Sequence, residues 1–368
     1  MLLMHLGDLH FGKTVNGFSM IEDQRYIMEE VIEMAKRRRP DVILLAGDIY
    51  DSKVPSTQAV ELFDEFLTSL SQAGFPICII SGNHDSAQRL NFGNRLFASK
   101  KIYFSCTKES ALSPIRLKDA YGGVNLWLLP FMGNADLEET IQEMQIDDKE
   151  RNVCLAHCFV LQGSQSPELS DSETLLSAGG LNGVDVSAFD AFDYVALGHL
   201  HMPQSMGRKE VRYCGSWLKY SASETGLSKS VPFVELKGKG QVEISLEPLI
   251  PLRDMRKIKG KLSTLVSDQV ASLADTKDYI YVTLTDETAQ LNPMETLRSV
   301  YPHVMQISFE NQQGGRVNAE QLSVEDLKHK SDADLFADFY EYVENRPYTE
   351  QKRKIMEDVI DEAAKTDR

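Results

Sequence analysis

Apolar and polar positions alternate along the first two hundred residues in a way that predicts short buried strands separated by helices. Leu2–Gly7 is the first apolar run. A helix is predicted to begin near Ser19, which stands three residues before Glu22 as in a capping box. Ile27 and Val31 lie on the predicted apolar face of this helix.

The same pattern continues through the next predicted elements. The further strands are Val42–Ala46, Ile77–Ser81, Leu126–Leu129, Val153–Ala156 and Tyr194–Leu197, with a helix over roughly residues 57–72. Continuous apolar runs of this kind are typical of strands that are covered on both faces. This part of the chain therefore predicts an α/β fold.

The pattern changes after about residue 210, where β-rich segments follow one another. A basic stretch from Arg253 to Lys261 then leads into a region with predicted strands at Tyr279–Leu284 and Val304–Phe309 and a helix from about Pro293. We predict a main domain over residues 1–250, a small α+β domain over residues 251–322, and an acid-rich helical tail over residues 323–368.

Five predicted strands end in residues that can bind metal ions. These are Asp8 and His10, Asp48, Asn83 followed by His84 and Asp85, His157, and His199 with His201. In open α/β sheets ligands bind beyond the carboxyl ends of the strands, so these side chains are expected to converge on one crevice. The set of carboxylates, imidazoles and one amide suits Mn²⁺, Fe²⁺ or Zn²⁺ better than Ca²⁺. Asp48, from a central strand, is the expected bridge between two cations.

Each motif also has a structural interpretation when it is taken alone. A Gly-Asp pair after an apolar run is commonly a turn, and Asn83 is a typical turn residue. His199 and His201 would, alone, be interpreted as surface residues at a strand edge. The occurrence of all five motifs after strands, with five of the eight histidines among them, favours the metal centre.

Composition narrows the class of protein. The chain has 368 residues and a formal net charge of −16, which counts against nucleic-acid binding by bulk electrostatics. A DNA-binding function would require local basic patches, metal ions or a partner.

Five scattered cysteines are typical of reduced thiols. No apolar run is long enough for a membrane span. We expect a cytoplasmic protein with no export signal. Cys154 and Cys158 flank His157, but without a second pair they are interpreted as buried thiols.

The motifs, in this order, resemble those of the calcineurin-like metallophosphoesterase superfamily. Within it the chain resembles the SbcD family of DNA double-strand-break repair nucleases. The segments that carry this resemblance are Gly7-Asp8-Leu9-His10-Phe11-Gly12-Lys13, Ala196-Leu197-Gly198-His199-Leu200-His201, Tyr213-Cys214-Gly215-Ser216 through Tyr220-Ser221 to Glu224, and Leu335-Phe336-Ala337-Asp338-Phe339-Tyr340. The resemblance covers nearly the whole chain and implies a β-sandwich flanked by helices, with the small domain as a cap.

The resemblance also implies roles for the individual residues. One metal ion, most simply Mn²⁺ with Mg²⁺ as a further possibility, would be held by Asp8, His10 and His201. The other would be held by Asn83, His157 and His199, and Asp48 would bridge the two. His84 would face the substrate and stabilise the transition state or protonate the leaving oxygen, and Asp85 would orient His84. The cations that follow this motif are candidates for contacts with DNA phosphates: Arg89, Arg95, Lys100 and Lys101.

The family further implies an activity and a partner. SbcD-type proteins act as double-strand exonucleases and as single-strand or hairpin endonucleases in DNA repair, recombination and replication. They work with the SbcC ATPase, as a homodimer within a heterotetramer, and residues 323–368 are a candidate docking segment or simply a domain-completing helix pair. Rival functions are a phosphoprotein phosphatase, a cyclic-nucleotide phosphodiesterase and a metal-free scaffold. The phosphatase pattern is not matched, because Ser52 and Lys53 follow Asp51.

Overall fold

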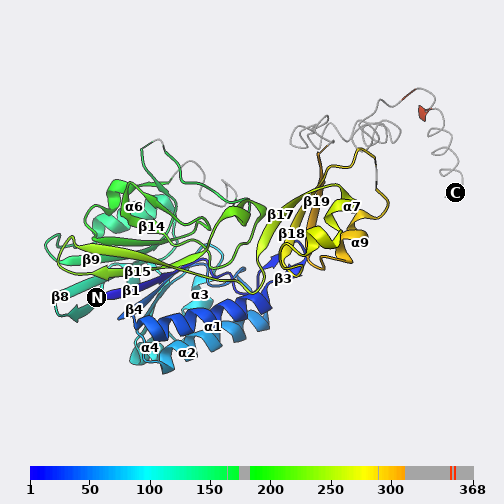
Figure 1. Cartoon of the computed structure of the whole chain (residues 1–368). Coiled ribbons are helices and arrows are strands. Elements are labelled where there is room, and N and C mark those ends of the chain that lie inside the picture. The colour runs from blue at the N-terminus through cyan, green and yellow to red at the C-terminus, as the bar shows by residue number, and fades with distance from the viewer. Residues whose placement is uncertain (164, 174–182, 289, 311–348, 350–351, 354–368) are drawn as a thin grey trace, which may run out of the picture. The chain divides into compact units, whose positions relative to one another are not determined.

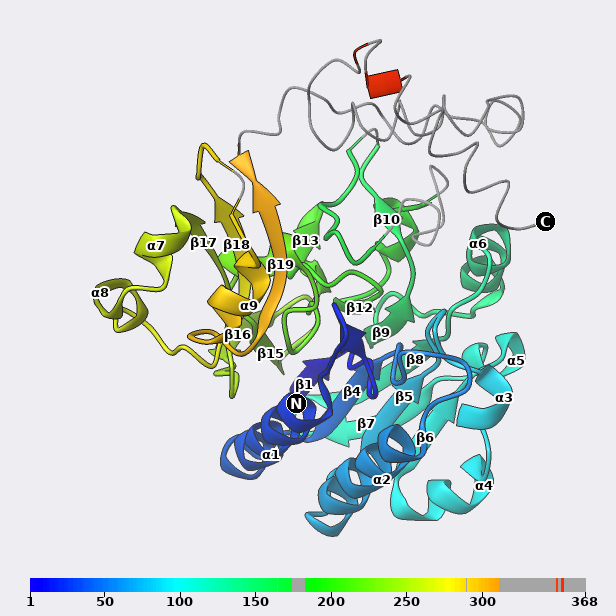
Figure 2. The ribbon, with the colours of Figure 1, turned by 90° about the vertical axis from the view of Figure 1, so that its right-hand side faces the viewer.

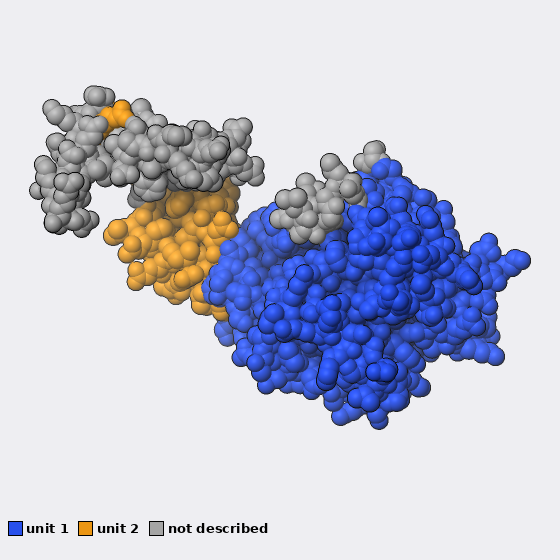
Figure 3. Space-filling view, turned by 180° about the vertical axis from the view of Figure 1, so that it is seen from behind, with its two compact units in different colours: residues 1–257, 277–281 blue, residues 258–276, 282–368 orange. Residues whose placement is uncertain are grey.

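A computed structural model describes residues 1–163, 165–173, 183–288, 290–310, 349 and 352–353. The chain forms two compact units, coloured separately in Figure 3. Unit 1 is Met1–Lys257 with Lys277–Tyr281, and unit 2 is Ile258–Thr276 with the residues from Val282 onward. The predicted tail over residues 323–368 lies outside the described residues, apart from 349 and 352–353.

Unit 1 is built around two six-stranded sheets. In spatial order the first contains β16 (Val242–Pro248), β15 (Ser230–Leu236), β1 (Leu2–Leu6), β4 (Val42–Ala46), β5 (Ile77–Ile80) and β6 (Ile102–Ser105). The second contains β13 (Gln204–Met206), β14 (Arg208–Tyr213), β12 (Tyr194–Gly198), β9 (Arg151–His157), β8 (Gly122–Leu129) and β7 (Ile115–Asp119). The predicted strands of the first two hundred residues are thereby confirmed.

The two sheets pack face to face as a sandwich. One apolar cluster contains Leu3 and Leu44 from the first sheet together with Leu126 and Leu155 from the second. Strands β1, β4, β5 and β6 are mutually parallel, and so are β8, β9, β12 and β14. The carboxyl ends of four strands therefore meet at one edge of each sheet, which is where side chains from distant segments can gather.

Helices cover the outer face of the first sheet. Figures 1 and 2 show α1 (Ile21–Arg38) and α2 (Thr57–Gln72) side by side against it. Ile27 and Val31 are buried as predicted. The expected capping box is wrong: Ser19 pairs with Thr14 in the hairpin of β2 (Thr14–Val15) and β3 (Phe18–Ser19), and Met20 precedes the helix without a side-chain cap.

Shorter elements complete unit 1. They are α3 (Ala87–Leu90), α4 (Asn94–Phe97), η1 (Ala98–Lys100), α5 (Lys108–Ala111), α6 (Asn134–Glu143), β10 (Val160–Leu161), β11 (Val184–Asp185), η2 (Val186–Phe189) and η3 (Ala222–Gly226). All five cysteines are free, as the composition predicted, and all five are buried. No helix among the described residues is long and apolar enough to cross a membrane.

The second region of the chain has a separate three-stranded sheet in the order β17 (Met255–Gly260), β18 (Tyr279–Leu284) and β19 (Val304–Phe309). Its helices are α7 (Leu262–Leu265), α8 (Asp268–Ala271) and α9 (Pro293–Arg298). The two strands and the helix predicted here are confirmed.

Candidate metal centre

The predicted metal ligands lie at the carboxyl ends of the parallel strands of both sheets. Asp8 and His10 follow β1, Asp48 follows β4, and Asn83 follows β5 in the first sheet; His157 ends β9, and His199 and His201 follow β12 in the second. One cleft is lined by His10, Lys13, Asp48, Asn83, His84, Ser172, Glu173, His199 and His201. The fold thus brings together side chains that are up to 193 positions apart in the sequence, from Asp8 to His201.

A first group of donor atoms surrounds His10. Its Nε2 lies 2.9 Å from Nε2 of His201 and 3.7 Å from Oδ2 of Asp48. Donor atoms of Asp8, His10 and Asp48 lie within 4.8 Å of one another. Oδ1 of Asp8 accepts a hydrogen bond of 2.9 Å from the backbone N–H of His199, whereas the buried Oδ2 has no hydrogen-bond partner among the described residues.

A second group of donor atoms surrounds His157. Its Nε2 is 3.0 Å from Oδ1 of Asn83 and 3.2 Å from Nδ1 of His199, and the latter two atoms are 3.0 Å apart. Oδ2 of Asp48 lies 3.6 Å from Nε2 of His157. The same carboxylate oxygen therefore lies within 3.7 Å of both groups, between them.

Hydrogen bonds at the opposite ring nitrogens orient two of the histidines, His157 and His201, and in a third, His10, this nitrogen lies near a carboxylate. Nδ1 of His157 lies 2.7 Å from the carbonyl oxygen of Ala46, and Nδ1 of His201 lies 2.8 Å from the hydroxyl of Ser172. Nδ1 of His10 lies 3.4 Å from Oδ1 of Asp51. Metal-bound histidines usually donate their second N–H in this way, which fixes the ring and leaves the other nitrogen for the ion.

The backbone at the site is unusual. Asp8, His10, Asp48 and His199 all have positive φ, at 52°, 47°, 47° and 106°. This conformation costs energy for residues other than glycine and is found mostly where function requires it. A Cβ on the neighbouring Gly82 would lie 2.1 Å from Oδ1 of Asp48, so only glycine permits this close approach.

Electrostatics explain why cations fit this donor set. Burial lowers the pKa of His10 and of His157, and lowers that of His201 well below its ordinary value, so these imidazoles are neutral and able to bind metal near neutral pH. Burial and the adjacent Asp48 raise the pKa of Asp8 well above its ordinary value. Divalent cations would neutralise this pair of carboxylates and would engage Oδ2 of Asp8.

His84 lies in the cleft as expected, but Asp85 does not orient it. Nδ1 of His84 is 2.9 Å from the carbonyl oxygen of Asp51. The Asp85 carboxylate accepts instead from the backbone N–H groups of Ile49, Tyr50 and Gly82 at 3.1, 2.9 and 2.8 Å. A buried carboxylate needs several donors, and these three backbone groups provide them. Asp85 therefore holds the loop after β4 against the turn after β5.

The predicted DNA-contacting cations lie outside this cleft lining. Arg89 is on α3, Arg95 is on α4, and Lys100 and Lys101 lie at the end of η1; all four side chains are exposed. Their contact with DNA stays a prediction.

Sequence reasoning missed several residues around the centre. Ser172 and Glu173 lie in a loop with no apolar periodicity, and Glu173 accepts a hydrogen bond from the backbone N–H of His201. In the sequence the Gly215–Glu224 motif indicates only a family resemblance, although it provides buried support for the site. Ser216 N–H and Lys229 Nζ both donate to the carbonyl oxygen of His201, at 3.2 and 2.8 Å.

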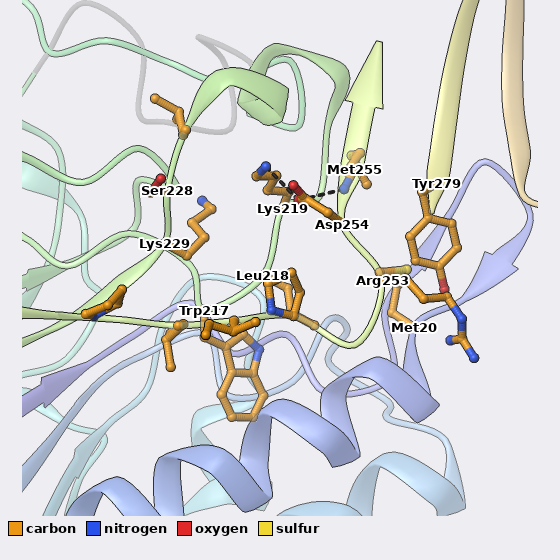
Figure 4. Close-up of a pocket in the computed structure, with 15 residues that line it drawn as sticks. Met20, Trp217, Leu218, Lys219, Ser228, Lys229, Arg253, Asp254, Met255 and Tyr279 are labelled. Atoms are coloured by element: carbon orange, nitrogen blue, oxygen red, sulfur yellow. Dashed lines mark hydrogen bonds and ion pairs between the residues drawn. The ribbon is translucent and has the colours of Figure 1, made fainter. Parts of the chain in front are cut away.

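A second cleft of about 250 Å³ in unit 1 lies beside Trp217 (Figure 4). Its three cations are already paired. Lys219 contacts Asp254 at 2.7 Å, Lys229 contacts Glu224 at 2.5 Å, and the Arg253 guanidinium contacts the Asp23 carboxylate at 2.8 Å. No cation of this second cleft is therefore left without an acid partner.

Comparisons with known proteins show which families the chain is similar to. Residues 1–203 match the model of the calcineurin-like phosphoesterase family, and residues 251–344 match that of the type 5 capsule protein repressor C-terminal domain. The SbcD component of the SbcCD nuclease of Staphylococcus epidermidis is 30% identical over 362 residues, which cover 92% of each chain.

Two solved structures are also similar. A protein from Thermus thermophilus is 10% identical, with a TM-score of 0.40, over 67% of this chain and 98% of its own. A dimetal phosphatase from Danio rerio is 12% identical, with a TM-score of 0.39, over 68% of this chain and 99% of its own.

Proposed function

The chain belongs to the SbcD family of calcineurin-like phosphoesterases, and from this premise we propose that it is a DNA nuclease whose activity depends on two divalent metal ions. The observation that carries the proposal is the position of the Asp48 carboxylate between two groups of donor atoms. Such a shared carboxylate is the usual arrangement in two-metal phosphoryl hydrolysis. Asp8, His10 and His201 would hold one ion, and Asn83, His157 and His199 the other.

The donor set favours a first-row transition metal. It combines imidazole nitrogens with carboxylate and amide oxygens, which suits Mn²⁺, Fe²⁺ or Zn²⁺, and Mn²⁺ is the ion we propose, with Mg²⁺ as an alternative. Bound ions supply Lewis-acid stabilisation of the phosphate and lower the pKa of water. The protein residues hold the histidine rings in place and exclude bulk water from the buried carboxylates.

We assign His84 the contact with the reacting phosphodiester. Its Nδ1 is engaged by the carbonyl oxygen of Asp51, which leaves Nε2 for the substrate. Its backbone N–H donates to Oδ1 of Asp48 at 2.8 Å, so the ring is held next to the proposed bridge. A protonated imidazole in this position would stabilise the transition state or protonate the leaving oxygen.

Replacing His84 by alanine should lower the rate of DNA cleavage by about 10²–10⁴-fold, the usual contribution of a positioned acid or base. Metal content, measured by mass spectrometry of the purified protein, should stay at that of the wild type. His303→Ala, in the turn between α9 and β19 and far along the chain from the motifs, is the matched control and should cleave normally. Loss of metal from His84→Ala would contradict the assignment.

The proposed activity is tested with three substrates and Mn²⁺. We expect cleavage of linear duplex DNA as an exonuclease and of single-stranded hairpin DNA as an endonuclease, with little turnover of a generic phosphomonoester. Both DNA activities should stop when a chelator is added. Rapid phosphomonoester hydrolysis without DNA cleavage would favour the phosphatase alternative, and turnover unaffected by chelation would refute the metal dependence.

The partner we propose is SbcC, the ATPase subunit that this family implies. A chain with a net charge of −16 gains little DNA affinity from bulk electrostatics, so we expect a partner that binds DNA. We propose that residues 323–368 dock on it. Deleting them should abolish co-purification with SbcC while basal nuclease activity is retained, and a shortened chain that still co-purifies would refute the docking.

We further propose that the chain forms a homodimer through the segment over residues 86–101, in a heterotetramer with SbcC. Phe92 and Leu96 in this segment are 84% and 78% exposed, unusual for large apolar side chains so close together. Light scattering should give the mass of a dimer for the wild type and of a monomer for Phe92→Ser/Leu96→Ser. An unchanged mass in that variant would exclude this surface.

A further inference from the structure

Lys13 is the one Lys or Arg among the nine described residues that line the metal cleft. It follows Gly12 in the loop after β1, three positions beyond His10. Its side chain is only 14% exposed, so it is not a freely moving surface lysine. Neither the proposed metal ligands nor the proposed role of His84 uses it.

Two contacts hold the ammonium group in place. Nζ of Lys13 donates to Oδ1 of Asp51 at 2.7 Å and lies 5.4 Å from the centre of the Tyr220 ring, within the range of a cation–π contact. The hydroxyl of Tyr220 donates to the carbonyl oxygen of Leu9 at 2.8 Å. This hydrogen bond fixes the aromatic ring that contacts the Lys13 ammonium group.

The loop that carries Lys13 is also braced. The buried Gln24 accepts from the backbone N–H of Gly12 at 2.9 Å and donates to the carbonyl oxygen of His10 at 2.7 Å. The backbone N–H of Lys13 donates to the same carbonyl oxygen at 3.0 Å. The position of Lys13 is therefore tied to that of His10, a proposed metal ligand.

The positive charge of Lys13 would stabilise an anion bound in the cleft. An ammonium group has three N–H donors, and Asp51 is the one hydrogen-bond acceptor that it has among the described residues. The acid side chains of the cleft lining, Asp48 and Glu173, would repel a phosphodiester. A fixed side-chain cation beside metal ions stabilises the charge of a phosphoryl group, as in other phosphoryl-transfer sites.

We propose that Lys13 donates a hydrogen bond to a non-bridging oxygen of the phosphodiester that is bound at the metal centre. The proposal rests on the proposed nuclease function. Through Asp51 the same ammonium is linked to His84, because the carbonyl oxygen of Asp51 is the partner of Nδ1 of His84. Lys13 thus holds the phosphate on the side of the cleft where His84 lies.

The alternative is that Lys13 only neutralises Asp51 and so supports His10, whose Nδ1 is 3.4 Å from that carboxylate. The supporting role and the phosphate-binding role predict different effects of replacing Lys13. A supporting role would alter metal binding, whereas contact with phosphate would alter the affinity for anions while the metal content stays the same.

The test uses the full-length chain loaded with Mn²⁺ and inorganic phosphate as the probe. Calorimetry should show phosphate binding weakened about 10- to 100-fold by Lys13→Met, which is the usual effect of removing a charged hydrogen bond. Lys13→Arg should recover most of the affinity because it keeps the charge. In duplex DNA cleavage, Lys13→Met should raise KM.

The control is Lys118→Met, which removes the same charge from an exposed position on β7. Lys118 pairs with Gly123 at the beginning of β8, away from the carboxyl ends of the strands. The Lys118→Met variant should bind phosphate with the affinity of the wild type.

Equal phosphate affinity in Lys13→Met and the wild type would overturn the proposal. So would loss of Mn²⁺ from Lys13→Met, because Lys13 would then act through Asp51 and His10. Failure of the nuclease function would appear separately, as a wild-type chain that neither binds two Mn²⁺ nor cleaves DNA.

Discussion

Asp48→Ala is expected to remove both metal ions and to lower DNA cleavage by at least about 1000-fold, because metal ions stabilise the transition state by several kcal/mol. Oδ2 of Asp48 is 3.7 Å from Nε2 of His10 and 3.6 Å from Nε2 of His157, so one side chain contributes to both groups of donor atoms. Its other oxygen accepts the backbone N–H of His84. The substitution should therefore misplace His84 as well.

Metal content per chain and the rate of duplex cleavage are the two measurements. Asp190→Ala, which removes an exposed carboxylate at the end of η2, should change neither. If Asp48 were only a turn residue, its alanine variant would keep both ions and nearly full activity, and the proposed bridge would be wrong.

Glu224→Ala is expected to lower the free energy of unfolding by about 3–5 kcal/mol, the usual cost of leaving one partner of a buried ion pair alone. Glu224 is fully buried, and its carboxylate accepts from Lys229 at 2.5 Å, from the Ser221 hydroxyl at 2.8 Å and from the backbone N–H of Tyr220 at 3.1 Å. Without it, Lys229 would remain as a buried cation with only neutral acceptors.

The substitution should also weaken metal binding, since Lys229 donates to the carbonyl oxygen of His201. Urea unfolding of the metal-free protein measures the stability effect by itself. The double variant Glu224→Leu/Lys229→Met leaves no buried charge and should regain most of the lost stability. A loss below about 1 kcal/mol in Glu224→Ala would show that the pair is not buried in solution as it is in the structure.

Much of the fold could be predicted because apolar runs mark buried strands. Val42–Ala46 is a strand with all five residues buried, and each of the predicted ligands follows a run of this kind. The neighbours of a strand are harder to predict, because they depend on pairing over long sequence separations. Leu2 of β1 pairs with Glu235 of β15, and no local pattern indicates that contact.

The site was predictable where residue type and position alone decide the chemistry. Asp48 and His157 have donor atoms that suit metals and lie at the carboxyl ends of strands, so their convergence could be expected. The partners of Asp85 could not, because its hydrogen bonds go to the backbone N–H groups of Ile49, Tyr50 and Gly82, and every residue except proline has such a group. The role of Lys13 could not be predicted either, since one lysine in a loop has no distinguishing pattern.

The left-handed backbone at Asp8, His10, Asp48 and His199 sets stability against activity in this protein. Each such residue costs on the order of 1–3 kcal/mol that the surrounding sandwich must offset. Selection for a more heat-resistant chain would favour glycine at these four positions, yet each replacement would delete a donor atom. Higher thermal stability must therefore come from substitutions elsewhere in the molecule. The conformation of these turns lowers the folding stability by an amount that cannot be recovered without loss of the metal ligands.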